Sequence, residues 1–161
     1  MSAAAPLKAF RPALPALALR FVVFLALLGG SILYAAARQP ADLVVHTASG
    51  PHRFTLEWAT TPREREHGLM GRKSMPADHG MIFDFGTEQS VIFWMKDTPL
   101  SLDMVFIAAD GTVRNVAHRA VPFALDMIPS GAPVRYVLEV NGGTAERLGI
   151  VPGTTVEIGK P

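Results

Sequence analysis

Apolar and polar residues alternate most cleanly around Phe54, Leu56 and Trp58, with a polar or charged residue between each pair. Successive side chains of a strand point to opposite faces, so this pattern predicts a strand with one buried side and one wet side. Residues 134–140 alternate in the same way. There the apolar positions are predicted to face inward and Glu139 to face outward.

Three largely apolar runs, 81–85, 91–95 and 102–108, are bounded by turn-forming or polar residues. Runs of this kind are typical of strands that are covered on both faces. Together with the alternating segments and the turns between them, they predict eight or so short strands. The strands are expected over residues 42–47, 52–59, 81–85, 91–95, 102–108, 112–117, 134–140 and 154–158.

One short helix is predicted to follow the second strand. Thr61 can cap it, Pro62 suits its first position, and Glu64 can reach back to complete a capping box. The helix is expected to run to about Met70 and to end near Gly71. Its residues are polar on all sides until its last turn, which is typical of a solvated connector.

A second helical turn is predicted over residues 144–148, capped by Thr144 and stopped by Gly149. Many short strands with few helical residues indicate a mainly β protein, a compact antiparallel barrel or sandwich with one or two short helices. Residues 42–161 are enough for a single domain with its own core.

Residues 1–41 have the composition of an export signal or an N-terminal membrane anchor. They hold four basic residues and no acidic one, and residues 21–37 carry no charge. The small residues Ala35–Ala37 suit signal peptidase, so cleavage after Ala37 and retention of an anchor helix are both open. Either outcome predicts a periplasmic location or one on the outer face of the cytoplasmic membrane.

The remaining part of the chain, residues 42–161, has 11 basic and 14 acidic residues. This balance gives no general attraction to phosphate backbones, so nucleic acid is not expected as a partner. The sequence has no Cys, which excludes disulfides, thiol catalysis and thiolate metal sites. No cofactor is predicted.

A polar cluster directly follows the apolar run 91–95 and is the candidate ligand site. Strand alternation places Trp94 and Lys96 on one face, where an indole beside a cation suits a sugar, an aromatic compound or an acidic metabolite. The alternative is that Trp94 belongs to the core and Lys96 reaches solvent. The candidate ligand-binding residues are Arg65, Arg72, Trp94, Lys96, Asp97, Thr98 and Asp103.

Asp103 shares a face with apolar residues and needs a partner if it is buried. Arg65, Arg72 and Lys96 are the partners of the right charge. Such a group is either a structural ion-pair network or the polar floor of a ligand site, and both interpretations stay open.

Two other functions are weaker candidates. A hydrolase could use Asp97 and Asp103 as acid and base, although no recognised catalytic motif is present. A copper-handling protein could use thioether ligands in the exported compartment. The weak metal candidates are Met70, Met75, His79 and Met81, and Met residues more often fill gaps in the core.

Several separated sequence blocks resemble the small bacterial and archaeal family known as domain of unknown function 192. The blocks are Arg65, Gly68–Met70, Arg72, Gly80–Met81, Phe83, Phe93–Lys96, Thr98, Leu102–Asp103, Pro133, Tyr136–Glu139 and Leu148–Ile150. The likeness covers roughly residue 42 to the end, with Asp97 where the family usually has Asn. The resemblance implies a compact β-rich barrel or sandwich and no assigned activity. The favoured prediction is therefore an exported β domain that binds a small ligand or a partner without catalysis.

Overall fold

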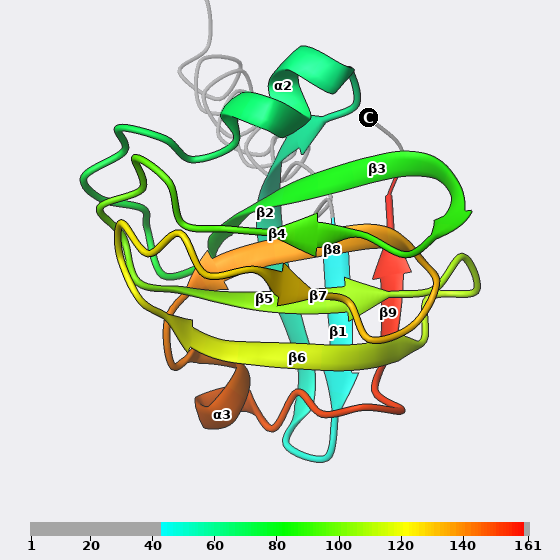
Figure 1. Ribbon diagram of the computed structural model, residues 1–161. Helices are drawn as coiled ribbons and strands as arrows, with labels where there is room; N and C mark the ends of the chain where they lie inside the picture. Colours follow the sequence, from blue (N-terminus) through cyan, green and yellow to red (C-terminus); the bar gives the residue numbers. More distant parts are fainter. Residues whose placement is uncertain (1–42, 160–161) are drawn as a thin grey trace, which may run out of the picture. The chain divides into compact units, whose positions relative to one another are not determined.

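The computed structural model describes residues 43–159, and a curled seven-stranded sheet forms most of them (Figure 1). The strand order across this sheet is β6-β5-β8-β3-β2-β1-β9. The protein is therefore mainly β, as predicted, with a half-barrel as its frame. The strands are β1 (Leu43–Thr47), β2 (Gly50–Ala59), β3 (His79–Gln89), β5 (Leu102–Ile107), β6 (Val113–Ala120), β8 (Val134–Asn141) and β9 (Thr155–Ile158).

Four shorter elements complete the described chain. Two of them pair with each other as a small two-stranded sheet that lies in front of β8 and β5 in Figure 1. The other two are single short helices. These elements are β4 (Ile92–Phe93), β7 (Ile128–Pro129), α2 (Pro62–His67) and α3 (Thr144–Leu148).

One strand pair departs from the antiparallel arrangement that the sequence predicted. β2 and β3 are parallel, with Thr55 opposite His79 and Ala59 opposite Phe83. Parallel neighbours need a crossover rather than a tight turn, and the chain between these strands supplies one that includes α2. The other strand pairs of the described sheet are antiparallel.

Strand β9, at one end of the strand order, also contacts the turn between β5 and β6. Thr112 pairs with Thr155, and the amide of Val156 donates to the carbonyl of Gly111 at 2.8 Å. Gly111 has a φ of 84°, and a Cβ there would collide with the Val156 carbonyl. A glycine is therefore required where the two ends of the half-barrel approach.

Both faces of the central strands are buried. Val105 and Ile107 of β5 pack in an interior cluster with residues of β1, β2 and β9, whereas Met104 and Phe106 pack in a second cluster on the outer face. All four side chains have no exposed surface. The prediction that residues 102–108 form a strand covered on both sides is confirmed.

The outer cluster is covered by loops and by β4. The ring centroid of Phe93 lies 5.0 Å from that of Phe83 and 6.2 Å from that of Phe106. The prediction of a doubly covered strand over residues 91–95 is wrong, because only Ile92–Phe93 is a strand and Ile92 is 63% exposed. This segment lies on the sheet as an outer layer, so one of its sides faces solvent.

Glu139 is also placed differently from the prediction. It was expected to face outward, but only 4% of its surface is exposed. β8 lies between β5 and β3 near the middle of the sheet, and the outer layer covers the side on which Glu139 stands. A carboxyl group is consequently held inside the protein.

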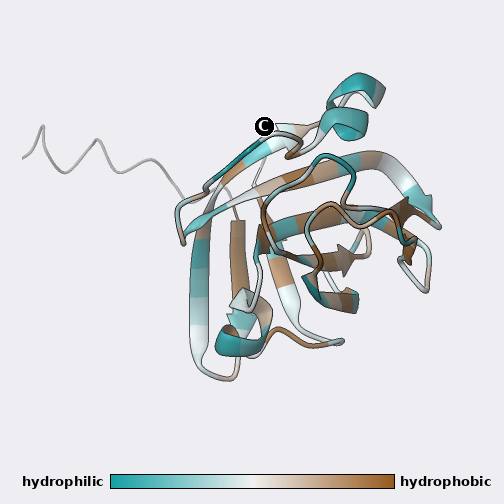
Figure 2. Cartoon of the chain, turned by 60° about the vertical axis from the view of Figure 1, so that its left-hand side comes forward, coloured by the Kyte–Doolittle hydropathy of each residue, from teal (hydrophilic) through white to brown (hydrophobic). Residues whose placement is uncertain are grey.

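Helix α2 has the predicted capping box. The amide of Glu64 donates to Thr61 Oγ1 at 3.3 Å, and the amide of Thr61 donates to Glu64 Oε2 at 2.9 Å. The helix ends at His67, earlier than predicted, because Gly68 leaves the helical conformation with a φ of 48°. Figure 2 shows α2 as a hydrophilic element, in agreement with the predicted solvated connector.

Helix α3 begins differently from the prediction. Gly143, and not Thr144, is its N-cap, and no side chain of the helix itself caps it. Its stop at Gly149, which has a φ of 73°, is as predicted. The predicted leader, residues 1–41, lies outside the described residues. Among residues 43–159, no helix is long and apolar enough to cross a bilayer.

Candidate functional site

A small pocket lies on the outer face of the sheet, between the end of α2, the segment after β4 and the central strands. Its cavity volume is about 30 Å³. Four of the predicted ligand-binding residues, Arg65, Trp94, Lys96 and Thr98, contribute to its wall. The complete lining is Arg65, Glu66, His67, Gly68, Leu69, Met70, Phe83, Phe93, Trp94, Lys96, Thr98 and Glu139.

Glu139 is the most unusual member of this lining. Only 4% of its surface is exposed, and its carboxyl group receives no hydrogen bond or ion pair from any described residue. Because no fully enclosed side-chain oxygen of the described residues lacks a partner, the carboxyl oxygens are accessible from the pocket. Burial disfavours the ionised form and raises the pKa of Glu139 to about 8. At neutral pH the free protein therefore keeps this group mainly protonated, with polar atoms directed at the pocket and not at a protein partner.

Thr98 supplies a second buried polar group. It is 5% exposed, and its hydroxyl donates to the carbonyl of Lys96 at 3.0 Å. Because that bond uses the only hydroxyl proton, the oxygen has only acceptor capacity left for a ligand. Thr98 and Glu139 thus both offer oxygen atoms to the same pocket.

Lys96 and Trp94 form the rim. Lys96 Nζ lies 5.4 Å from the centroid of the Trp94 ring, and Trp94 is 48% exposed. Lys96 forms no ion pair with a described residue. The predicted proximity of these two side chains is confirmed, although both residues lie beyond the end of β4 and not on a continuing strand.

Arg65 connects α2 to the sheet. Its Nη1 atom donates to the backbone carbonyls of Thr60 and Asp84, the latter at 2.8 Å, and its guanidinium lies 5.1 Å from the Phe85 ring centroid. These contacts hold the helix end at the side of the pocket. Arg65 is thus a wall residue whose guanidinium is already engaged by the protein.

Asp84, whose carbonyl accepts from Arg65, also forms an ion pair. Its carboxylate oxygens lie 3.1 Å from Nε and Nη2 of Arg135. Burial raises the pKa of Asp84. The hydrogen bonds from Arg135 and from the amide of Gly86, with the charges of Arg135 and Arg65, outweigh burial and hold that pKa below its usual value.

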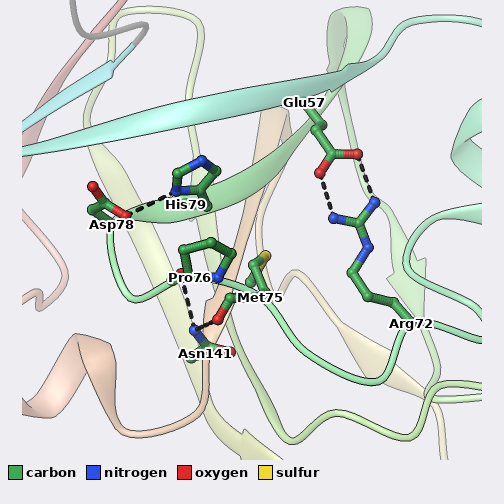
Figure 3. Close-up of polar contacts among 7 residues, drawn as sticks. All are labelled: Glu57, Arg72, Met75, Pro76, Asp78, His79 and Asn141. Carbon is green, nitrogen blue, oxygen red and sulfur yellow. Dashed lines mark hydrogen bonds and ion pairs between the residues drawn. The ribbon is translucent and has the colours of Figure 1, made fainter.

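Two of the predicted site residues lie outside the pocket. Arg72 pairs with both carboxylate oxygens of Glu57 (Figure 3), and Nη2 lies 2.7 Å from Oε2. Asp97 is exposed, and its carbonyl accepts a hydrogen bond from the amide of Gly71 at 2.8 Å. Both residues hold the loop that follows α2 and are not part of the pocket lining.

Asp103 is also outside the pocket, on the interior face of β5. Its carboxylate has no exposed surface and accepts the amides of Arg119 at 2.7 Å, Gly143 at 3.0 Å and Ala145 at 2.7 Å. The predicted pairing with Arg65, Arg72 or Lys96 is wrong. Backbone amides satisfy this carboxylate instead, and a single sequence gives no sign of such partners.

The weak metal candidates have separate surroundings. Met70 lines the pocket, whereas Met75 and Met81 are buried in the outer cluster. His79 Nδ1 contacts Asp78 Oδ1 at 2.8 Å (Figure 3). The described part of the chain contains no group of three or more His, Cys, Asp or Glu side chains that could hold a metal ion.

Sequence reasoning missed Glu139 as a site residue. Alternation in residues 134–140 predicts which residues share a face, but it does not reveal that an outer layer covers the second face of β8. The signal that could have found it is the family resemblance. Every lining residue except Glu66 and His67 falls in the sequence blocks that carry this resemblance.

Comparison with solved structures gives several similar chains, among them the two that follow. A protein from Sinorhizobium meliloti 1021, described as a "putative transcription regulator", has 52% sequence identity and a TM-score of 0.70, and the match covers 71% of this chain and 90% of that one. A protein of unknown function from Novosphingobium aromaticivorans DSM 12444 has 42% identity and a TM-score of 0.70, with 71% and 82% covered. The search of curated proteins gave no match.

The family model DUF192, described as "Uncharacterized ACR", matches residues 44–158. This match spans nearly all of the described β domain and agrees with the resemblance carried by the pocket and strand residues. The chain belongs to the DUF192 family.

Proposed function

We propose that this domain binds a small ligand without transforming it, and that the pocket between α2, β4 and β8 is the binding site. The observation that carries the proposal is Glu139, a largely buried residue whose carboxyl oxygens have no protein partner and stay accessible from this pocket. Polar groups inside proteins are nearly always hydrogen-bonded, to protein or to ordered water, so a carboxyl group without a protein partner takes its partner from the pocket. A ligand that reaches Glu139 would supply the missing partner.

The rim supports the same proposal. Lys96 has no counter-ion among the described residues, and it lies beside the partly exposed Trp94 ring. An ammonium group next to an indole suits an acidic group attached to an apolar body. The ligand we infer has an acidic end at Lys96 and a polar end that reaches Glu139.

A binding role fits the surroundings of the carboxylates better than hydrolysis. Asp103 is fully buried and tied to three backbone amides, so it is not open to a substrate. Asp97 is exposed on a turn outside the pocket lining. The acid and base pair of the hydrolase alternative therefore has no shared site in this fold.

We also propose export of this domain by its N-terminal segment, with the ligand met outside the cytoplasm. The support is the basic, acid-free leader with an uncharged stretch over residues 21–37. The excess of acidic over basic residues beyond position 41 argues against nucleic acid as a partner. The description of the S. meliloti protein as a regulator thus finds no support in the charge of this chain.

The binding proposal can be tested with a pooled metabolite screen by thermal shift on residues 38–161. We expect at least one compound to raise the melting temperature of the wild type but not that of Glu139→Gln or Lys96→Ala. Arg72→Ala is the matched control, because this cation lies outside the pocket. A screen without any compound that stabilises in this residue-dependent way would refute the proposal.

Export can be tested separately by fractionation of cells that express the full chain. We expect the protein outside the cytoplasm, and intact-mass measurement will distinguish cleavage after Ala37 from a retained leader. Recovery of the full chain only in the soluble cytoplasmic fraction would refute export.

A further inference from the structure

We propose that the end of the ligand that enters the pocket is a primary ammonium group, bound by the oxygens of Glu139 and Thr98, and that the ligand is a compact amino-acid-like zwitterion with its carboxylate at Lys96. This inference rests on the proposed function and names the chemistry of its ligand. It uses two residues of one pocket lining, Glu139, which receives no hydrogen bond from a described residue, and Lys96, which forms no ion pair with one.

The wall of the pocket formed by Thr98 and Glu139 has acceptor character. The Thr98 hydroxyl proton is committed to the Lys96 carbonyl, so its oxygen can only accept from a ligand. The ionised Glu139 carboxylate is likewise an acceptor only, and Phe83 and Phe93 add aromatic rings. A group that carries several N–H donors and a positive charge satisfies these partners together.

The size of the pocket limits the group that can enter it. A cavity volume of about 30 Å³ has room for roughly two water molecules, since one needs about 10 to 15 Å³ on this measure. A terminal CH₂–NH₃⁺ group has a similar size. A planar guanidinium or a sugar ring does not fit inside, although the body of a larger ligand can lie over the rim.

The rim of the pocket is positively charged, and this charge restricts the ligand further. Lys96 would repel a simple amine, because its own ammonium group lines the same pocket without a counter-ion. Arg65 adds a second positive charge but is held by the carbonyls of Thr60 and Asp84. A ligand with a carboxylate beyond its ammonium group removes the repulsion and pairs with Lys96.

Binding of this kind is coupled to release of a proton. Burial raises the pKa of Glu139 to about 8, so below this pH the free protein holds a proton that an ammonium ligand must displace. The other titratable groups that face the pocket are Arg65, Glu66 and His67 from the end of α2 and Lys96 from the segment after β4, whereas β3 contributes Phe83. Affinity should rise with pH up to about 8 and then level off.

The test uses isothermal titration calorimetry with a series of ω-amino acids from glycine to 5-aminopentanoate, because the chain length selects the span from Glu139 to Lys96. Butyrate and butylamine are the matched probes that lack one charged end of 4-aminobutyrate. We expect the best amino acid to bind at least about tenfold more tightly than either probe. Its binding enthalpy should depend on buffer ionisation at pH 6.5, with nearly one proton released, and not at pH 9.

Variants assign these effects to individual groups. Glu139→Gln should weaken amino-acid binding at least about tenfold at pH 8 and remove the proton release, and should weaken butyrate binding by a smaller factor. Thr98→Val should weaken binding and Thr98→Ser should restore it, which gives a second test if Glu139→Gln fails to fold. Retained proton release in His67→Gln shows that the imidazole is not its source.

Each result separates the inference from the function on which it rests. If butyrate binds as tightly as the best amino acid, or if no amino acid binds while a screened compound stabilises the protein through Glu139, the ammonium proposal is overturned and ligand binding stands. If the screen also fails, both are overturned. Proton release that persists in Glu139→Gln likewise contradicts the role given to this carboxyl group.

Discussion

The carboxylate of Asp103 in β5 accepts the backbone amide of Ala145 in α3 at 2.7 Å. Asp103 thereby caps a helix from a distant part of the chain, in a position where the helix has no cap of its own. The same carboxylate accepts two further hydrogen bonds, from the backbone amides of Gly143 and Arg119. Asp103 is thus a structural residue that joins β5, β6 and α3.

The variant Asp103→Asn should destabilise the domain by about 3 kcal/mol, because a side-chain amide offers one acceptor oxygen where two now receive three amides. Urea denaturation at pH 7 measures this loss. Asp97→Asn, at an exposed turn, is the control and should change the stability by less than about 0.5 kcal/mol. A denaturation midpoint of Asp103→Asn equal to that of the wild type would contradict the structural role.

The variant Glu139→Gln should make the ligand-free domain more stable at alkaline pH. The pKa of Glu139 is raised from the ordinary 4.5 to about 8, so the folded state holds its proton more tightly than the unfolded state. The contribution of Glu139 to the free energy of unfolding is therefore most favourable below pH 4.5. It falls by up to about 1.4 kcal/mol per pH unit as the pH rises toward 8, and it is constant above pH 8.

Urea denaturation of the wild type and Glu139→Gln at pH 5, 7 and 9 measures the difference. Relative to the wild type, the free energy of unfolding of the variant should rise by a few kcal/mol between pH 5 and pH 9. Glu66→Gln, which replaces an exposed carboxyl group beside the same pocket, serves as the control. Parallel pH profiles of Glu139→Gln and wild type would show that Glu139 does not titrate as described.

The variant Thr61→Ala should lower the free energy of unfolding by about 1 kcal/mol, because the amide of Glu64 loses the hydroxyl acceptor that caps α2. Thr61→Ser keeps an acceptor oxygen and should be close to the wild type. Thermal or urea denaturation of the three proteins checks the order of stability. A serine variant as unstable as the alanine variant would show that the methyl group, not the cap, is responsible.

The pair Arg72 and Glu57 should contribute less than about 1 kcal/mol in a double-mutant cycle, because both side chains are partly exposed to solvent. The coupling should decrease further with added salt. Stability of the two single alanine variants and the double variant gives the coupling energy. A coupling above about 2 kcal/mol that resists salt would mean that the pair is shielded from water.

Much of the fold follows from the sequence because local patterns determine it. The capping box at Thr61 and the buried run of β5 depend on spacing and on apolar periodicity, and both are confirmed. The parallel pairing of β2 with β3 is different, since it depends on where the crossover through α2 returns the chain. No local pattern in either strand specifies that choice.

The candidate site was only partly predictable for the same reason. Trp94, Lys96 and Thr98 are close in the sequence, and the structure keeps them together at the pocket. Glu139 joins them from a strand more than forty residues away, through a second covered face that alternation does not reveal. Asp103 has the charge of a site residue, but its partners are backbone amides and carry no side-chain signal.

The contact between β9 and the turn that contains Gly111 has a consequence for association. Exposed edges of sheets recruit strands from other molecules and begin aggregation. Here the bridge from Thr112 to Thr155 and the bond from Val156 to Gly111 occupy part of the outer edge of β9. A neighbouring chain would have to displace these bonds before it could add a strand there, which helps the domain to remain apart from its copies at high concentration.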